Sequence, residues 1–335
     1  MNRKTLIFII GVIVGFILLI LIFYFIGIQK VFSQMREVGF LGVSVFLLNA
    51  FLVFFIDAIS WQVILKSYGH HLPFKDVLTA KLVGIAIGYL TPSMYIGGEP
   101  VRVYMTSKKH NLSVTSIGAT VIVNKFLELG AGLFFVYLGS IWILIEYPLP
   151  RQIYLAILIM DVLFGLGMGF IFVNFIYENK VFTPLANFLG RIKLLSKIAR
   201  KIEPKVSEME DEVFLAFNQR KRATIFAFFL NMIAGFLIFL KPVIFFYFLR
   251  ILLKLSQLSL LFALTHLLLA FQFTPAGLGI FEIGAVGIYK LVGIQANKAL
   301  AYSLMNRISD SAEVGIAALL AVNLGLKGIF GNKKQ

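Results

Sequence analysis

Long runs of apolar residues dominate the chain, and short polar segments separate them. A helix needs roughly 20 apolar residues to cross the hydrocarbon core of a bilayer. Runs of that length lie at residues 5–28, 40–65, 113–145, 152–176, 223–249 and 297–326. Two more segments, at 76–110 and 256–296, begin as apolar runs, break at prolines and glycines, and then resume. The pattern predicts an all-α polytopic integral membrane protein with about six full spans and two broken-helix hairpins.

The first broken segment has an apolar arm that is too short to cross a bilayer. Residues 77–91 would form about 22 Å of helix, which passes the middle of a hydrocarbon core of about 30 Å without crossing it. Pro92 should stop this helix, because proline lacks the N–H group and restricts the residue before it. Gly97 and Gly98 allow a sharp turn, after which residues 99–109 can return as a short helix. We therefore expect a re-entrant hairpin.

The second broken segment follows the same plan. An apolar arm at 258–274 is followed by Pro275, then by Gly277 and Gly279, and then by a second arm at 281–291. We expect the proline and the two glycines to act as the helix break and its hinges. Each hairpin is thus expected to bring a break close to the middle of the bilayer.

The two broken segments also resemble each other in sequence. Three pairs of residues of the same kind are 183 positions apart: Thr91 and Thr274, Pro92 and Pro275, and Glu99 and Glu282. Three more pairs are 182 positions apart: Asn124 and Asn306, Lys125 and Arg307, and Glu128 and Asp310. We expect one membrane domain over 1–335 with a first repeat at about 40–146 and a second at about 223–328. Because the first hairpin would enter from the inside and the second from the outside, the repeats would be inverted, as in many transporters.

The charge distribution orients this domain. The net charge is +15, and the densest basic segment, at about 178–222, holds ten Lys or Arg residues. In a membrane protein such a segment marks the cytoplasmic side, and this explains the charge better than nucleic-acid binding does. We expect a multi-pass protein of the cell membrane with both termini in the cytoplasm, and a basic segment that lies on anionic lipid headgroups.

A resemblance to a known family is carried by two motifs. They are GGEPVR at 97–102, preceded by Thr91-Pro92, and TPAGLGIFE at 274–282, followed by the charged helix around Arg307. In these residues the chain resembles the transmembrane-region family of lysylphosphatidylglycerol synthase, the flippase-like proteins, over most of its length. The resemblance implies movement of aminoacylated phospholipids between leaflets. Where the family often has a Glu-Arg pair after the first motif, this chain has Asn124-Lys125.

Four charged residues are expected deep inside spans, where each costs about 2.5–3.5 kcal/mol and marks pairing or function. By helical rise, Lys125 and Arg307 lie about 15–18 Å into their spans, close to the midplane. Glu128 and Asp310 follow three residues later on the same helix faces. Two readings remain open. In the first, the four residues form ion pairs that only hold the repeats together. In the second, the cations bind a lipid phosphate, and the acids adjust the strength of this binding or release the phosphate.

Further candidates lie at the start of the returning helices. Glu99 and Glu282 can each cap a helix start or face a ligand, and the free N–H groups after Gly98 would suit an anion. Arg102 either extends to the membrane surface or binds a lipid phosphate. Five other residues are expected to be interior polar groups with protein partners: Asp57, Lys81, Asp161, His266 and Glu313.

These features predict a lipid translocase that moves an anionic or aminoacylated phospholipid between leaflets through a polar midplane cleft. An alternative is a transporter of polyprenyl-phosphate carrier lipids, and a less favoured one is an intramembrane lipid-modifying enzyme. Such an enzyme would need a nucleophile or a metal cluster at the midplane, and the sequence has no cysteine and no motif of that kind. We expect no enzymatic activity, no metal site, no cofactor and no nucleic-acid partner. The expected partner is a membrane lipid, with a homo-oligomer and a separate lipid-synthesising enzyme as further candidates.

Overall fold

The computed structural model describes residues 20–21, 24–91, 97–146, 150–192, 196–269 and 274–323, and within them the chain is helical without strands. The long helices are α2 (Ile28–Ser67), α5 (Val114–Glu146), α6 (Arg151–Ile176), α8 (Ser196–Asn218), α9 (Lys221–Phe248) and α12 (Ala296–Asn323). The shorter ones are α3 (Phe74–Leu90), α4 (Glu99–His110), α7 (Phe182–Leu189), α10 (Leu255–Leu269), the single turn η1 (Pro275–Gly277) and α11 (Ile280–Leu291). The prediction of an all-α polytopic membrane protein is confirmed.

Four of the described helices are long and apolar enough to cross a bilayer: Ile28–Ser67, Val114–Glu146, Tyr154–Ile176 and Lys221–Phe248. They match the apolar runs predicted at 40–65, 113–145, 152–176 and 223–249. The run at 5–28 lies mostly outside the described residues. The run at 297–326 forms α12. This helix is not among the four, because it contains too many charged residues to count as an apolar span.

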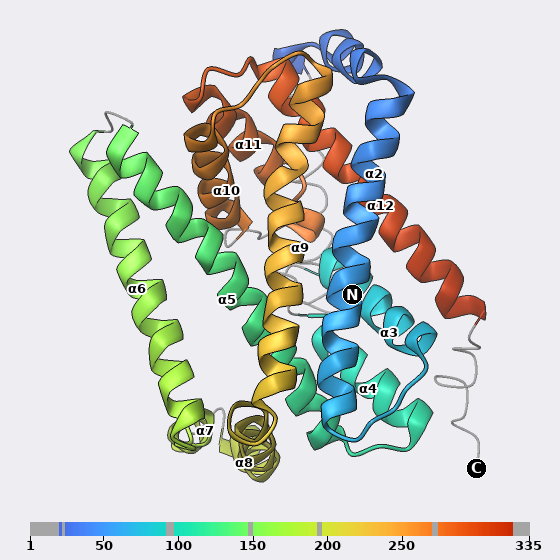
Figure 1. Cartoon of the computed structure of the whole chain (residues 1–335), viewed down its shortest axis with the longest axis vertical. Helices are drawn as coiled ribbons and strands as arrows, with labels where there is room; N and C mark the ends of the chain where they lie inside the picture. Colours follow the sequence, from blue (N-terminus) through green and yellow to red (C-terminus); the bar gives the residue numbers. More distant parts are fainter. Residues whose placement is uncertain are drawn as a thin grey trace.

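The helix α2 begins earlier than the apolar run predicts. It starts at Ile28 and bends at Gly39, whose backbone has φ 68° and ψ 174°, a conformation outside the helical region. The segment before the bend lies across the top of the molecule in Figure 1, and the segment after it descends beside α9. The predicted start at residue 40 therefore coincides with the bend and not with the start of the helix.

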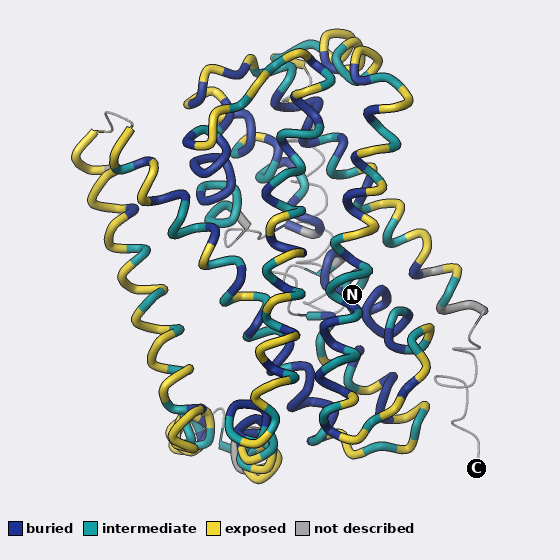
Figure 2. Tube along the Cα trace, in the orientation of Figure 1, coloured by how far each residue is buried: buried dark blue, intermediate teal, exposed yellow. Residues whose placement is uncertain are grey.

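The helices α2 and α9 form the centre of the molecule, and each is flanked by one broken helix pair (Figure 1). The largest apolar cluster joins α2 and α9 to α10, α11 and α12, and its aromatic centre includes Phe46, Phe245, Phe246 and Tyr302. In contrast, α6 packs mainly on α5 and is exposed along most of its length (Figure 2). An exposed apolar helix of this kind suits contact with lipid acyl chains.

The helices α3 and α4 form a hairpin whose two ends lie together. Asp76, in the first turn of α3, pairs with Lys109 at 2.7 Å and with His110 at 3.1 Å in the last turn of α4. The hydroxyl of Thr115, just after this hairpin, donates a hydrogen bond of 2.7 Å to Glu208 of α8. The hairpin therefore starts and ends at the end of the molecule that carries the basic segment.

The helices α10 and α11 form a second hairpin with the same property. The side-chain amide of Gln257, near the start of α10, donates a hydrogen bond of 3.1 Å to the carbonyl of Val292, just after α11. This hairpin lies at the opposite end of the molecule from α3 and α4 (Figure 1). The two hairpins thus point towards each other from opposite ends.

The glycines at the two breaks have different roles. Gly277 and Gly279 have φ angles of +63° and +76°, in the left-handed region that favours glycine, and Ala276 between Pro275 and Gly277 has a positive φ as well. Gly98 has an ordinary helical conformation, with φ −84° and ψ −18°, so its expected role in a sharp turn is wrong. A Cβ on Gly98 would lie 1.7 Å from the carbonyl oxygen of Gly84, and its absence therefore lets α4 pack closely against α3. Gly97 lies in the turn before α4, and the predicted break at Pro92 lies outside the described residues.

Candidate functional site: two polar clusters beside the helix breaks

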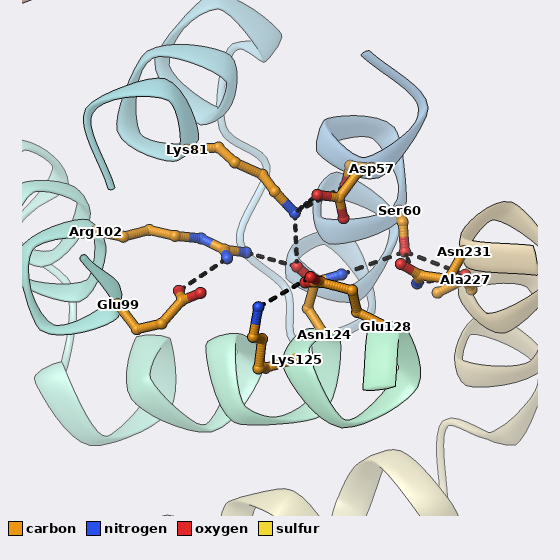
Figure 3. Close-up of polar contacts among 10 residues, drawn as sticks. All are labelled: Asp57, Ser60, Lys81, Glu99, Arg102, Asn124, Lys125, Glu128, Ala227 and Asn231. Atoms are coloured by element: carbon orange, nitrogen blue, oxygen red, sulfur yellow. Dashed lines mark hydrogen bonds and ion pairs between the residues drawn. The ribbon is translucent and has the colours of Figure 1, made fainter. Parts of the chain in front are cut away.

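The first polar cluster lies where α2, α3, α4 and α5 meet, and Figure 3 shows its side chains converging from all four helices. It consists of Asp57, Lys81, Glu99, Arg102, Asn124, Lys125 and Glu128. The three cations of the cluster come from three different helices, α3, α4 and α5. Its members hold the start of the returning helix α4 against α2 and α5.

Arg102 is one of the most deeply buried residues of the chain. Its side chain is 2% exposed, and its guanidinium carbon lies 3.6 Å from the centre of the Trp61 ring. One terminal nitrogen pairs with Glu99 at 3.1 Å, and the other donates to the Asn124 Oδ1 atom at 2.8 Å. The expectation that Arg102 extends to the membrane surface is therefore wrong. Glu99 pairs with this arginine at the start of α4.

Asn124 is the centre of the first polar cluster. Its Oδ1 atom accepts hydrogen bonds from Arg102 and also from Lys81, whose Nζ atom lies 3.1 Å away. Lys81 is 3% exposed and forms an ion pair with Asp57, as expected for interior polar groups with protein partners. The amide nitrogen of Asn124 donates to the Ser60 hydroxyl at 3.4 Å. This single buried amide thus connects two cations and the central helix α2.

Lys125 and Glu128 form the more open side of the first polar cluster. Their ion pair is 2.9 Å long, which confirms that the two side chains share one helix face. The lysine side chain is 24% exposed and the glutamate side chain 40%, whereas the other two cations of the cluster are sealed by protein. This ion pair is therefore the part of the cluster that a ligand can reach first.

The second polar cluster lies at the second break and consists of Tyr89, Ala276, Gly279, Glu282 and Arg307. Glu282 is fully buried, and its two oxygens have different partners. One accepts the Arg307 Nε–H at 2.7 Å, and the other accepts the backbone N–H of Gly279 at 2.7 Å. The expected cap on the start of α11 is confirmed. Arg307 pairs with this glutamate and not with Asp310, which corrects the expected Arg–Asp pair.

Arg307 also joins the two broken helices. One of its terminal nitrogens, Nη1, donates to the Tyr89 hydroxyl at 2.8 Å and to the backbone carbonyl of Ala276. Tyr89 ends the first apolar arm, and Ala276 lies within the second break. The other terminal nitrogen, Nη2, is buried and has no hydrogen-bond partner among the described residues. A buried guanidinium N–H without a partner is costly and is a natural position for an anion.

The remaining candidates divide into two groups. The ring of His266 bonds to the Phe262 carbonyl at 2.8 Å, and the Asp161 carbonyl accepts from the Tyr137 hydroxyl at 2.7 Å, which places both residues in local protein contacts. Asp310 and Glu313 are half-buried on α12 and form no ion pair with any described residue.

No group of three or more His, Cys, Asp or Glu residues in the described part of the chain could hold a metal ion.

Several residues of the two clusters were not predicted as site residues. In the sequence, Asn124 stands out only because it matches Asn306 of the second repeat. Its role becomes visible in the structure, where Lys81 of α3 and Arg102 of α4 both donate to it. Ser60 and Asn231 extend the first cluster to α9 through a hydrogen bond of 2.7 Å. Tyr89 carries no sequence signal that separates it from the other tyrosines. The charges of Asp57 and Lys81 inside apolar segments were the signal that could have placed them in the site.

Comparison with known proteins gives the family. The family described as the lysylphosphatidylglycerol synthase TM region matches residues 8–312. The chain belongs to this family. It is also similar to a UPF0104 membrane protein of Methanocaldococcus jannaschii, with 24% identity over 88% of each chain. A UPF0104 membrane protein of Pyrococcus horikoshii is 24% identical over 89% of this chain and 91% of its own. No solved structure matches the chain. The family supports a lipid-related role in the membrane.

Proposed function

We propose that the protein is a lipid translocase without enzymatic activity that moves an anionic or aminoacylated phospholipid between the leaflets. The observation that carries the proposal is the unpartnered Nη2 nitrogen of Arg307, buried where the two broken helices meet. Arg307 lies 11 residues past the start of α12, or about 16 Å along the helix, which is near the middle of a hydrocarbon core of about 30 Å. A phosphate group there would receive a charge-assisted hydrogen bond, while its acyl chains stay in the bilayer.

The opposed hairpins support an inverted-repeat mechanism for this movement. Each hairpin returns to the end at which it starts, and the two start from opposite ends. In transporters built from inverted repeats, broken helices meet near the midplane, and one half rocks against the other around that point. In this proposal 74–110 and 255–291 are re-entrant, the basic segment faces the cytoplasm, and the bond between Tyr89 and Arg307 closes the path.

The two halves pair their matched charges differently, and this suggests how the path opens. In the second half, Arg307 bonds to Glu282 at the start of the returning helix. In the first half, the matched cation Lys125 bonds to Glu128 on its own helix and not to Glu99. Inverted repeats commonly adopt two conformations that exchange during transport. We propose that reversal moves Lys125 to Glu99 and Arg307 to the acid matched to Glu128, which is Asp310.

The same guanidinium chemistry would also serve a polyprenyl-phosphate lipid, so the assay separates the two lipid classes. The purified full chain would be placed in liposomes with a fluorescent short-chain phosphatidylglycerol, and its movement would be followed by quenching the outer leaflet. We expect wild-type protein to accelerate this movement at least tenfold over protein-free liposomes. Unlabelled lysylphosphatidylglycerol should compete with the reporter, and polyprenyl phosphate should compete less.

Two variants make the assay specific for the Arg307 site. Arg307→Lys keeps the positive charge but loses the planar fork, so it should retain only part of the rate. Arg191→Lys changes an exposed arginine in the same chemical way and should leave the rate unchanged. Movement of the fluorescent phosphatidylglycerol that is no faster than in protein-free liposomes would refute the proposed translocase. Stronger competition by polyprenyl phosphate would instead favour the carrier-lipid alternative.

A further inference from the structure

The end of the molecule that carries α7 and α8 has a basic groove outside both polar clusters. It is open to the surface and has a volume of about 500 Å³ between the last residue of α2 and the junction of α8 and α9. The groove is lined by Ser67, Asn218, Gln219, Arg220, Lys221, Arg222 and Ala223. Three consecutive cations therefore face one concave surface at the point where an apolar span begins.

The cations of the groove have no direct ion-pair partner among the described residues. Arg220, Lys221 and Arg222 form no ion pair with any described carboxylate. The guanidinium of Arg220 is held in place by the Tyr68 ring, whose centre lies 3.8 Å from its central carbon. Its Nη1 atom is buried and has no hydrogen-bond partner among the described residues. The groove thus combines one guanidinium that is held by an aromatic ring with two further cations.

The start of α9 adds to the anion preference of the groove. Arg220 occupies the N-cap position without a side-chain hydrogen bond to the helix, and the first turn contains no acidic residue. The N–H groups at a helix start carry partial positive charge and suit a phosphate. The helix start and the Arg220 guanidinium therefore both favour an anion. The Nη1 atom without a hydrogen-bond partner is the observation that points to a ligand.

The surface beside the groove shows what kind of anion fits it. One face of α9 continues from Arg222 into a stripe of exposed apolar side chains: Ile225, Phe226, Phe229, Ile233 and Phe236. These residues recur at one-turn intervals, so they form a continuous strip along the span. A ligand with a phosphate at one end and acyl chains at the other would match both parts. We infer that the groove binds the headgroup of an anionic phospholipid at this membrane surface, separately from the site at Arg307.

The inference can be tested by lipid binding without any transport measurement. The purified full chain in mild detergent would be titrated with phosphatidylglycerol or phosphatidylcholine, and the bound lipids would be counted by native mass spectrometry. Each cation near an anionic lipid surface adds to the binding free energy. The double variant Lys221→Gln/Arg222→Gln should therefore weaken the tightest phosphatidylglycerol binding about tenfold or more. This variant leaves the stacked Arg220 intact and should keep its fold.

The matched control is Arg191→Gln/Lys201→Gln, which removes one arginine and one lysine from exposed positions at the same end. It should weaken the tightest phosphatidylglycerol binding clearly less than the groove variant does, because neither residue lines the groove. The groove variant should keep its lipid movement in the liposome assay, which separates the groove from the proposed transport site. Equal losses in the two double variants, or equal binding of phosphatidylcholine, would overturn the inference. Displacement of the lipid by soluble glycerol phosphate at similar concentration would show that the groove takes a free anion, and the lipid assignment would be wrong.

Discussion

The Nη1 atom of Arg307 donates a hydrogen bond of 2.8 Å to the hydroxyl of Tyr89, a residue 218 positions earlier in the chain. This bond connects the end of the first apolar arm to the helix that follows the second hairpin. The same nitrogen bonds to Ala276 in the second break. One guanidinium therefore bonds to both broken helices and also pairs with the buried carboxylate of Glu282.

The Arg307–Glu282 pair predicts strong coupling between the two residues. Arg307→Gln leaves a fully buried carboxylate without its cation, which typically costs about 3–5 kcal/mol. In the double variant Glu282→Gln/Arg307→Gln no charge is left behind, so the loss of stability should be smaller than in Arg307→Gln alone. Thermal unfolding of the purified variants in detergent measures this difference. Additive losses in the double variant would show that the two residues are not coupled.

The proposed exchange of partners predicts a separation of stability from transport at Asp310. This residue forms no ion pair with a described residue, so Asp310→Asn should change the melting temperature by no more than about 2 °C. If Arg307 needs this carboxylate in the reversed state, the same variant should slow lipid movement at least tenfold. Asn306→Gln, one turn earlier on α12, serves as the control. An unchanged rate in Asp310→Asn would contradict the exchange and leave the binding role of Arg307 untouched.

The central position of Asn124 predicts that its amide oxygen is essential for folding. Asn124→Leu has a similar volume but leaves Lys81 and Arg102 without a shared acceptor. Since hydrogen bonds to charged groups contribute about 1.5–3 kcal/mol each, the loss of stability should reach about 3 kcal/mol or more. Asn124→Asp keeps an acceptor for both cations and should remain closer to wild type. Both effects can be read from melting temperatures. A stable Asn124→Leu protein would show that the cluster does not need this acceptor.

The close contact of Gly98 with Gly84 predicts a large effect of one methyl group. In Gly98→Ala the new Cβ would lie 1.7 Å from the Gly84 carbonyl oxygen, so α3 and α4 must separate. We expect a loss of at least about 3 kcal/mol or failure to accumulate in the membrane. Gly287→Ala is the control, because its Cβ would meet no atom within 4 Å and alanine favours the helix. Similar folded yields of the two variants would contradict the proposed packing role.

The opposed hairpins predict the sides of two loops. The chain has no native cysteine, so a single introduced cysteine is the only labelling site. Lys109 and Gln295 are both exposed. Lys109 lies in the last turn of the first hairpin, and Gln295 lies just after the second. A membrane-impermeant thiol reagent added to intact cells should label Gln295→Cys and spare Lys109→Cys. Labelling of Lys109→Cys from outside would place the basic segment outside as well, against the positive-inside rule. The proposed orientation would then be wrong.

The positions of the long helices could be predicted from the sequence, but the partners inside the site could not. The apolar run at 113–145 and the helix Val114–Glu146 differ by one residue at each end, because hydrophobic length determines where a span begins and ends. The pairing of Lys125 with Glu128 is also readable, because three residues separate neighbours on one helix face.

Contacts between helices depend on packing that no local pattern encodes. Arg307 has an acid three residues away on its own helix, yet it bonds to Glu282 on the preceding helix. Arginine side chains are usually exposed, yet Arg102 is buried against the Trp61 ring and Asn124. In each case the decisive neighbour arrives from another helix, which no local sequence pattern specifies.

The bond between Ser60 and Asn231 has a consequence for the biosynthesis of the protein. It links α2 to α9, the pair of described helices with the most extensive contact, across 171 positions of the chain. At about 5–20 residues per second, a ribosome needs on the order of ten to thirty seconds to make that stretch. During that time the newly inserted first half has no α9 beside it, and the hydroxyl of Ser60 lacks its later partner. The first half therefore lacks its contact with α9 until late in synthesis, and a nascent chain released before α9 emerges would leave the face of α2 that packs on α9 uncovered in the bilayer.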